Sequence, residues 1–572
     1  MALAVQAGES FDADDLHILA VAVQQALVGE SATVSAGTSS RLQQRLGPVY
    51  VALRANGAPV ASAWADGPTA LRATTAAVQA AAVKAAMVSR DEDVRPQVTD
   101  AELCISHSYR LIDPIEEARG LLTNVHRGVL GIAIDYAGQI SYYSPTLMLA
   151  NNWSFDRVFE DVVDVHHLSV EQLERDADVF VFSGDQVLVS LTEPPEAVPM
   201  ERGNRLVTME EVTQPKVQEL ENLMGQWLTS ALHEDGRMTY KYWPSRGEES
   251  TSNNMIRQWM ATVALNRLAA RDGDHALYEN AAGNIRYNLQ EFYREEGDLG
   301  LIEYAGKVKL GGVALAALAL IEHPQRAEFS HEEAALRRTV EALWQEDGSF
   351  RTFYLPSDRN DNQNFYPGEA LVLWATLYAQ EQDTDLLERF MMSFEYYRAW
   401  HLDPENRNPA FVPWHTQAYY ILWTETNDPA LRDFIFQMND WLLSMQEWDS
   451  ATYGDTMGRF YDSSRPQYGP PHASSTGTYL EGLIDAYRLA VAVGDSGRAD
   501  QYRLAIRRGL RSVMQLQFAD DIDLYYISRR ELALGGIRTT VYDNEIRVDN
   551  VQHNLLAVLK ILETFTPADF TG

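Results

Sequence analysis

The segment KLGGVALAALALI, at residues 309–321, would be apolar on nearly every face of a helix. A helix at a protein surface carries one apolar stripe, so a helix of this composition must be buried between neighbours. A loop rich in Gly, Asn, Tyr and Pro precedes it, and the same order of loop and apolar helix recurs along the chain. The segment therefore predicts one unit of a repeated helical architecture.

Six such units are predicted from about residue 210 onward. Their apolar inner helices begin near Asn254, Gly311, Pro367, Trp414, Ser475 and Asn550. Amphipathic outer helices alternate with them, at about residues 212–232, 274–296, 328–346, 383–400, 428–447 and 495–516. One helical hairpin cannot bury its own apolar face, so hairpins must stack, and six of them can close into a ring. An open solenoid is the alternative, but a closed ring better explains why the repeat stops at six.

The first 205 residues follow a different pattern, in which strands and helices are mixed. Strands are predicted at residues 49–54, 60–64, 102–109, 129–136, 140–143, 178–182 and 187–191. The turn Asn56-Gly57 joins the first two, and the last two are predicted to form a closing hairpin. Helices are predicted at residues 71–88 and 155–163, and the Pro-rich residues 193–199 are the predicted linker.

The predicted fold class is therefore multidomain. An N-terminal α+β domain, residues 1–205, is followed by an all-α (α/α)6 toroid, residues 206–572.

The chain is strongly acidic, with 47 Lys and Arg against 81 Asp and Glu, so its formal net charge is 47 − 81 = −34. Such a surface repels phosphate backbones and anionic lipids, which argues against nucleic-acid and membrane partners. The scarcity of lysine is equally typical of a protein from a salt-rich environment and of a genome that favours Arg. The sequence shows no basic signal-peptide region and no apolar run of transmembrane length, so a cytoplasmic location is expected.

Cofactor and metal sites are not expected from the sequence. Cys104 is the only cysteine, so one chain can form neither an internal disulfide nor a thiolate metal cage. No H-x-x-x-H or H-E-x-x-H spacing occurs, and the Gly311-Gly312 and Gly535-Gly536 pairs lack the context of a phosphate-binding loop. The expected cofactors and metals are therefore none.

The alternation of inner and outer helices resembles the α/α toroid of six-hairpin glycosidases, uronate epimerases and lyases, lanthionine cyclases and terpenoid cyclases. The loop WQEDGSF, at residues 344–350, is similar to the Q-x-x-D-G-x-F/W turn of the last group, and HEDGRM, at residues 233–238, is a weaker copy. In such a turn Gly takes a positive-φ position and Asp caps the local backbone, so the turns indicate a fold rather than a chemistry.

Short motifs of the N-terminal region also match a known family. They are YVAL at residues 50–53 with Asn56-Gly57, LCIS at 103–106, HRGVLG at 126–131, then Gly138, Ser144-Pro145 and Trp153. Over roughly residues 40–190 the chain resembles the AMMECR-type domain family. The resemblance implies an α+β fold for this region and no particular chemistry.

The pocket of a toroid is expected where the inner helices begin, because their positive dipole ends and the polar loops before them meet there. The candidate catalytic residues are Glu369, Glu481, Asp549, His415 and Tyr366. The candidate substrate-binding residues are Tyr242, Trp243, Arg257, Lys309, Trp414, His472, Tyr479, Arg547 and His553. For any one of these residues the alternative is a structural role, as a helix cap or a tie between loops.

Aromatic rings beside carboxylates are typical of a sugar site, since rings stack on sugar faces and carboxyls act as acid and base. Arg257, Lys309 and Arg547 suit a negatively charged group. The leading hypothesis is a carbohydrate-active enzyme that acts on an acidic or uronate-containing glycan by hydrolysis, elimination or epimerisation. The alternatives are a cyclase of peptides or isoprenoids, with a more apolar pocket, and a non-catalytic binding scaffold, with a pocket filled by side chains. The oligomeric state is not predicted.

Overall fold

The computed structural model describes residues 11–30, 41–88, 97–112 and 121–571. The N-terminal region is built on an antiparallel sheet, with seven strands among the described residues. Its strand order is β2-β1-β3-β6-β4-β5, and β7 pairs with β6. The strands are β1 (Val49–Ala55), β2 (Ala58–Ala65), β3 (Asp100–Ile112), β4 (Leu130–Tyr136), β5 (Gln139–Tyr143), β6 (Ala177–Ser190) and β7 (Glu196–Met200).

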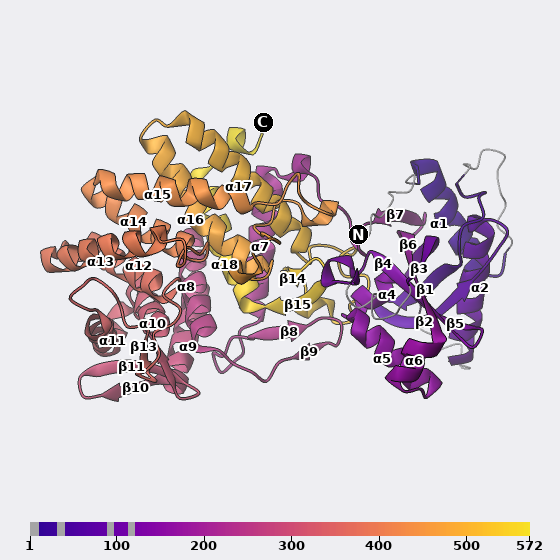
Figure 1. Cartoon of the computed structure of the whole chain (residues 1–572), viewed down its shortest axis with the longest axis horizontal. Coiled ribbons are helices and arrows are strands. Elements are labelled where there is room, and N and C mark those ends of the chain that lie inside the picture. Colours follow the sequence, from indigo (N-terminus) through magenta and orange to yellow (C-terminus); the bar gives the residue numbers. More distant parts are fainter. Residues whose placement is uncertain (1–10, 31–40, 89–96, 113–120, 572) are drawn as a thin grey trace.

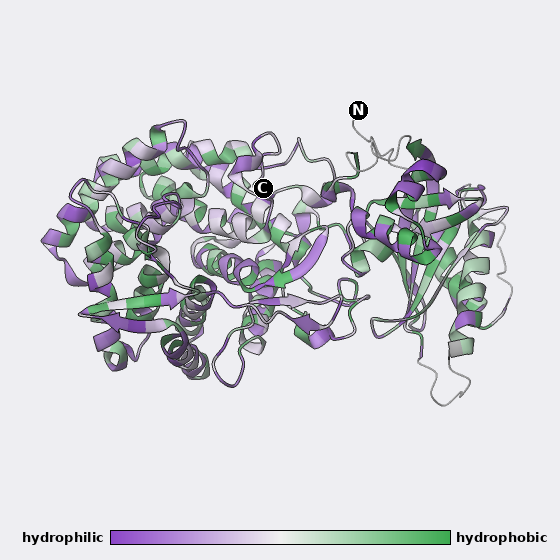
Figure 2. Cartoon of the chain, turned by 60° about the horizontal axis from the view of Figure 1, so that its bottom comes forward, coloured by the Kyte–Doolittle hydropathy of each residue, from purple (hydrophilic) through white to green (hydrophobic). Residues whose placement is uncertain are grey.

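Helices cover this sheet. They are α1 (Ala13–Leu27), α2 (Ala70–Val88), α4 (Pro145–Ala150), α5 (Phe155–His166) and α6 (Val170–Asp176). Helix α2 packs on β1 and β2, and α1 packs on α2, β6 and β7 (Figure 1). Leu19, Val51 and Leu103 are fully buried in this core. The strands are mostly hydrophobic in Figure 2, as a sheet with packed faces requires.

Two sequence predictions for this region are wrong. The expected closing hairpin at residues 178–182 and 187–191 is one continuous strand, β6, because Gly184 and Asp185 pair with Ser106 and Ile105 of β3 instead of turning. The predicted linker at residues 193–199 contributes instead to β7, which lies at the edge of the sheet, where the missing N–H of Pro199 is tolerated.

Within residues 206–571, all of which the structure describes, helices alternate between two concentric layers. The inner helices are α8 (Met255–Asp272), α10 (Leu310–Glu322), α12 (Tyr366–Glu381), α14 (Phe411–Thr426), α16 (Ala473–Ala492) and α18 (Val548–Thr564). The outer helices are α7 (Gln214–Ser230), α9 (His275–Phe292), α11 (Ser330–Leu343), α13 (Thr384–Leu402), α15 (Pro429–Leu442) and α17 (Ser496–Leu516). Each begins within a few residues of its predicted start.

The inner helices form a closed ring, which is called the inner ring below. Each contacts the next one in chain order, and α18 contacts α8, so the ring closes on itself (Figures 1 and 2). Each inner helix also packs against the outer helix that follows it in the chain, and the last inner helix, α18, packs against the first outer helix, α7. All but the last residue of α10 are buried, as its composition predicts. This arrangement is an α/α toroid, and it excludes the open solenoid.

The toroid is not all-α, which corrects the prediction. Its loops hold two four-stranded sheets, β10-β11-β12-β13 and β14-β15-β8-β9. The strands are β8 (Lys241–Trp243), β9 (Glu248–Glu249), β10 (Tyr293–Glu296), β11 (Leu299–Tyr304), β12 (Lys307–Lys309), β13 (Phe353–Leu355), β14 (Arg538–Thr540) and β15 (Asp543–Arg547). β12 and β15 end where an inner helix begins.

The turns that resemble those of other toroids have the expected geometry. Gly348 has φ +90° and Gly236 has φ +86°. The Asp347 carboxylate accepts a hydrogen bond from the Ser349 amide at 2.9 Å. In the described residues of the chain no helix is both long and apolar enough to cross a membrane.

Candidate active site at the N-terminal ends of the inner ring

A cavity of about 370 Å³ lies where the inner helices begin. Five helices of the inner ring line it directly, and Lys309 lines it from the N-cap position of the sixth, α10. The lining includes Arg257, Lys309, Tyr366, Glu369, Pro413, Trp414, His472, Ser475, Tyr479, Arg547 and His553. The positive ends of the helix dipoles therefore meet around one cavity, as the sequence predicts.

Glu369 lies in the first turn of α12, directly after Pro367 and Gly368. Proline at the start of a helix is preorganised for this position and fixes where the following residues lie. The Glu369 side chain is buried, and its Oε2 atom has no hydrogen-bond partner among the described residues. Burial raises the pKa of the Glu369 carboxyl to about 7, against the opposing charges of Arg257 and Lys309. The carboxyl can therefore hold or release a proton near neutral pH.

Gly311, in the first turn of α10, makes room for this carboxyl. A Cβ atom at position 311 would lie 1.8 Å from Glu369 Oε2, closer than any real contact. The glycine thus allows the carboxyl to approach the backbone of the neighbouring helix.

Asp549, at the start of α18, pairs with two arginines at the cavity wall. Its carboxylate accepts hydrogen bonds from Arg547 Nε at 2.9 Å and Arg547 Nη2 at 2.5 Å, and Arg257 Nε lies 3.1 Å away. Burial alone would raise the pKa of the Asp549 carboxyl, but the two guanidinium groups outweigh it and lower the pKa to about 2. Asp549 is therefore an ionised group that orients Arg257 and Arg547 towards the cavity.

His553, about one helical turn further along α18, is oriented by Glu481 of α16. His553 Nδ1 lies 2.7 Å from Glu481 Oε1, and both side chains are almost fully buried. A carboxylate at this distance places the imidazole proton on Nδ1. Because His553 lines the cavity, the Nε2 edge is left as a proton acceptor for a ligand.

Lys309 occupies the N-cap position of α10, and its ammonium group forms no ion pair or hydrogen bond with a described residue. Burial, and then the charges of Lys307 and Arg257, lower the pKa of its ammonium group. Aromatic rings complete the wall, and the Trp414 and His553 rings pack edge to face with centroids 6.2 Å apart. Burial raises the pKa of Tyr366 and of Tyr479 well above its ordinary range, so both phenols stay protonated hydrogen-bond donors.

Nine of the fourteen predicted site residues line the cavity. They are Tyr366, Glu369, Arg257, Lys309, Trp414, His472, Tyr479, Arg547 and His553. Two more, Glu481 and Asp549, lie directly behind the lining and contact it through His553 and the two arginines.

The remaining three lie elsewhere. His415 is fully buried, its ring stacks on Phe411 with centroids 3.4 Å apart, and burial lowers its pKa to about 3. Tyr242 is buried and lies in β8, opposite Ile546 of the neighbouring strand β15. Trp243 donates its indole N–H to Glu545 Oε2 at 2.8 Å. These positions fit a structural role, because each ring is occupied by packing or by a partner in the protein.

Several lining residues were not predicted, among them Asn362, Phe365, Ser474 and Thr478. Ser474 and Thr478 are four residues apart on α16, so they share a face, and this spacing was an available signal. Asn362 and Phe365 lie in the loop before α12, whose course the sequence does not specify. Among the described residues no three His, Cys, Asp or Glu side chains lie close enough to hold a metal ion.

No protein-family model matches the chain, and no curated protein matches it in sequence. Among solved structures it is similar to cellobiose 2-epimerase from Bacillus thermoamylovorans B4167, with 12% identity and a TM-score of 0.47, over 62% of this chain and 99% of that one. It is also similar to a D-mannose isomerase, with 13% identity and a TM-score of 0.46, over 60% and 97%. An unsaturated glucuronyl hydrolase specific for heparin has 11% identity and a TM-score of 0.44, over 61% and 97%. The AMMECR-type resemblance of residues 40–190 stays a prediction.

Proposed function

We propose that this chain is a carbohydrate-active enzyme that acts on an acidic sugar by moving a proton at the carbon next to the carboxylate. The observation that carries the proposal is a cavity that combines basic side chains with two proton-transfer groups. Glu369 is a buried carboxyl with an unpartnered oxygen, and His553 is an imidazole oriented by a carboxylate. Groups with such environments are typical of acid–base catalysis.

The basic side chains favour an anionic ligand. Arg257, Lys309 and Arg547 line the cavity in a chain whose net charge is −34, so the positive charge there is local. Asp549 binds Arg257 through Nε, which leaves both terminal nitrogens of that guanidinium for a carboxylate. Lys309 adds a further cation, and its ammonium group, unlike Arg257, has no partner among the described residues. A carboxylate is also the group that makes a neighbouring C–H acidic enough to be removed.

The two proton-transfer groups come from opposite sides of the inner ring. In the order α8, α10, α12, α14, α16 and α18, Glu369 is on α12 and His553 is on α18, three helices away in either direction. A sugar between them exposes opposite faces to the two groups.

For a uronate, His553 Nε2 would accept the proton from C5, and the electron pair of the C–H bond would move into the carboxylate, where Arg257 and Lys309 stabilise the added charge. Return of a proton from Glu369 to the other face of C5 gives epimerisation. Loss of the substituent at C4, with a proton from Glu369 to its oxygen, gives elimination. Both reactions use the same two residues. If Glu369 were the base and His553 the acid, the same number of protons would be moved.

Hydrolysis is less well supported by the side chains at the cavity. A glycosidase usually needs two carboxyl groups that face the scissile bond. Asp549 and Glu481 are instead buried behind the lining and engaged by arginines or by His553. The charged lining also disfavours an isoprenoid substrate. The open volume of the cavity disfavours a non-catalytic scaffold, whose pocket would be filled by side chains.

The test is hydrogen exchange at carbon. Uronate mono- and oligosaccharides are incubated with the protein in D₂O, and NMR follows deuterium entering at C5. We expect exchange with wild type, and strongly reduced exchange with Glu369→Gln and with His553→Phe. Exchange at C2 of a neutral aldose, without exchange at C5 of any uronate, would show that the substrate is a neutral sugar and not a uronate. No exchange at any carbon would contradict proton transfer as the chemistry.

A further inference from the structure

The N-terminal region of the chain binds the toroid next to the cavity. Asn152, in the loop after α4, donates from Nδ2 to Asp543 Oδ1 at 2.9 Å. Asn544 donates from Nδ2 to the Leu149 carbonyl at 3.1 Å, and Asn544 is fully buried. Arg127 donates from Nη2 to Asn152 Oδ1 at 2.9 Å, so both ends of the Asn152 amide are engaged. These contacts fix the first residues of β15.

The strand β15 leads directly into the site. It begins at Asp543 and ends at Arg547, which lines the cavity and is the N-cap residue of α18. Asp549 and His553 follow in the first turns of α18. Three residues therefore separate Asp543, which contacts Asn152, from Arg547, the first side chain of the cavity. A displacement of the start of β15 would be transmitted along the extended strand to Arg547.

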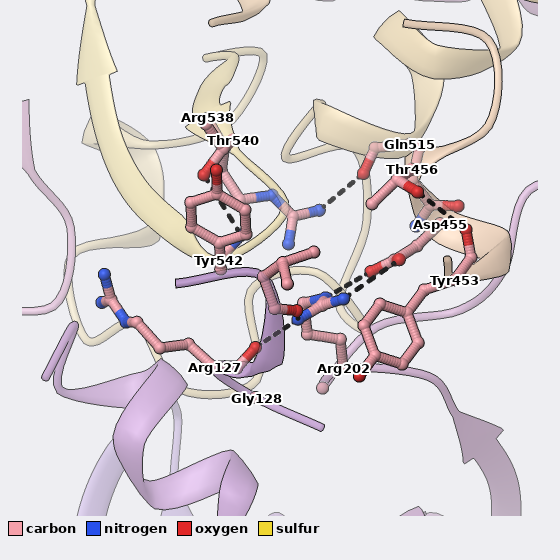
Figure 3. A network of polar contacts seen from close by, with 12 residues as sticks. Arg127, Gly128, Arg202, Tyr453, Asp455, Thr456, Gln515, Arg538, Thr540 and Tyr542 are labelled. Carbon is pink, nitrogen blue, oxygen red and sulfur yellow. Dashed lines mark hydrogen bonds and ion pairs between the residues drawn. The ribbon is translucent and has the colours of Figure 1, made fainter. Parts of the chain in front are cut away.

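A second set of contacts surrounds Arg202, which is almost fully buried (Figure 3). Its Nε lies 2.6 Å from Asp455 Oδ2, in the loop between α15 and α16, and its Nη1 donates to the Val125 carbonyl at 2.8 Å and to the Arg127 carbonyl. The same loop ends at Tyr468 and His472, which line the cavity. Contacts at Arg530 with Asp100, and of Gly57 with Ile527, join the N-terminal region to the toroid at other places.

We propose that the N-terminal domain is a positioning element of the toroid site and that Asn152 is its positioning residue. Asn152 acts through Asp543 and β15 on the Arg547–Asp549 pair, and it does not touch the ligand. The Arg530 and Gly57 contacts do not involve Asn152, and Arg202 bonds the backbone carbonyl of Arg127 rather than the guanidinium that reaches Asn152. Loss of Asn152 therefore leaves the N-terminal region and the toroid associated and acts mainly on β15. The aspect of this inference that concerns ligand binding rests on the function proposed above.

Asn152→Asp is the variant that breaks the contact most cleanly. The backbone at position 152 has φ +53°, a conformation that Asp tolerates nearly as well as Asn, so the loop keeps its shape. The new carboxylate still accepts from Arg127, but it faces Asp543 as a like charge. Asp543→Asn in the same chain restores a hydrogen bond with its direction reversed. Asn151→Asp is the matched control, because the Asn151 side chain is exposed and, among the described residues, bonds only the Leu147 carbonyl of its own helix.

The experiment measures backbone hydrogen–deuterium exchange and D-glucuronate affinity in the full chain. We expect exchange over residues 541–553 to rise about tenfold in Asn152→Asp, and glucuronate affinity to fall about tenfold, with both restored in the double variant. The control and the α12 segment should behave as in wild type. A merely structural contact would leave the glucuronate affinity of Asn152→Asp unchanged.

Two outcomes would overturn the inference. One is unchanged exchange over residues 541–553 in Asn152→Asp. The other is that wild type binds glucuronate and Asn152→Asp binds it equally well, which would leave the proposed function intact. If wild type binds no glucuronate but exchange rises and is rescued, the positioning role is supported and the proposed substrate fails.

Discussion

The two ends of the inner ring differ in how their charged side chains are partnered. At the N-terminal end, Glu369 Oε2 has no partner among the described residues, and Lys309 forms no ion pair with them. At the C-terminal end, a second cavity of about 430 Å³ is lined by charges that are paired. Lys560 Nζ lies 2.5 Å from Asp485 Oδ2, and Arg267 makes two hydrogen bonds to Glu322 at 2.8 and 3.0 Å.

This difference separates structure from function. A buried charge without a partner destabilises the fold, so its presence needs a reason other than stability. A buried charge with a partner is compensated. Removal of one member of the pair leaves the other as an uncompensated buried charge, which lowers stability. The paired charges of the C-terminal end therefore stabilise the ring. On the proposed function, the N-terminal end, beside its own Asp549 and Glu481 pairs, would keep Glu369 and Lys309 available for a ligand.

The largest effect is expected at Glu369. Glu369→Gln keeps the size of the side chain but removes the transferable proton. We expect the rate of proton exchange at the substrate carbon to fall about 10³-fold, with no loss of thermal stability at neutral pH. Steady-state exchange rates and differential scanning calorimetry measure the two quantities. Unchanged rates would remove Glu369 from the chemistry.

Lys560→Met tests the paired end. It removes the cation that partners Asp485 and should lower the free energy of unfolding by about 3 kcal/mol, as in other broken buried pairs. Arg488, 3.1 Å from Asp485, limits the loss. Urea denaturation measures the change. A large loss of ligand affinity at unchanged stability would contradict a structural role for this end.

The pH dependence of stability should have opposite signs at two carboxyls of the same wall. The Glu369 pKa is raised from 4.5 to about 7, so wild type loses stability relative to Glu369→Gln as pH rises from 4.5 to 7. The Asp549 pKa is lowered from 3.8 to about 2, so the stability that Asp549 contributes is present above pH 3.8 and is lost as pH falls through 2. The two pKa differences correspond to changes in the free energy of unfolding of about 3 kcal/mol for Glu369 and about 2 kcal/mol for Asp549. Unfolding curves of wild type, Glu369→Gln and Asp549→Asn across pH measure both changes. If the free energy of unfolding of all three proteins had the same pH dependence, the environments assigned to the two carboxyls would be wrong.

The smallest effect is expected at Lys309. Lys309→Met should weaken the binding of D-glucuronate about tenfold, the effect of one lost charge-assisted hydrogen bond. It should not lower stability, because Lys309 has no partner among the described residues. Lys307→Met is the control, since Lys307 lies two residues away and is exposed. Equal losses in the two variants would indicate a general effect of charge.

Much of the helical architecture could be predicted, because it follows from apolar composition that is local in sequence. The segment that forms α10 is apolar on all faces, and only a helix enclosed by neighbours can bury it. The small sheets could not be predicted in this way. β9 has only two residues, and its pairing with Tyr242 and Trp243 depends on how the chain returns from a turn. Gly184 reads as a turn residue but is extended, because its partner strand is available.

The site shows the same limit. Glu369, Arg257 and Arg547 could be predicted from their places at inner-helix starts. The pairing of His553 with Glu481, 72 residues apart, depends on the contact of α16 with α18, which only the closed ring provides. His415 has a similar place in sequence but lies one turn into α14, where its ring packs against Phe411, Tyr397 and Tyr419. The Asn152–Asp543 contact spans 391 residues and has no local signal.

The most direct test of the contrast between the two ends is a calorimetric titration of wild type with D-glucuronate and, separately, with D-glucose. The two sugars share a ring and differ only in the carboxylate at C6. We predict that glucuronate binds more tightly, that Lys309→Met reduces the difference about tenfold, and that Lys560→Met leaves it intact. Equal affinity for the two sugars, or a preference abolished by Lys560→Met alone, would contradict a carboxylate-binding site at the N-terminal end of the inner ring.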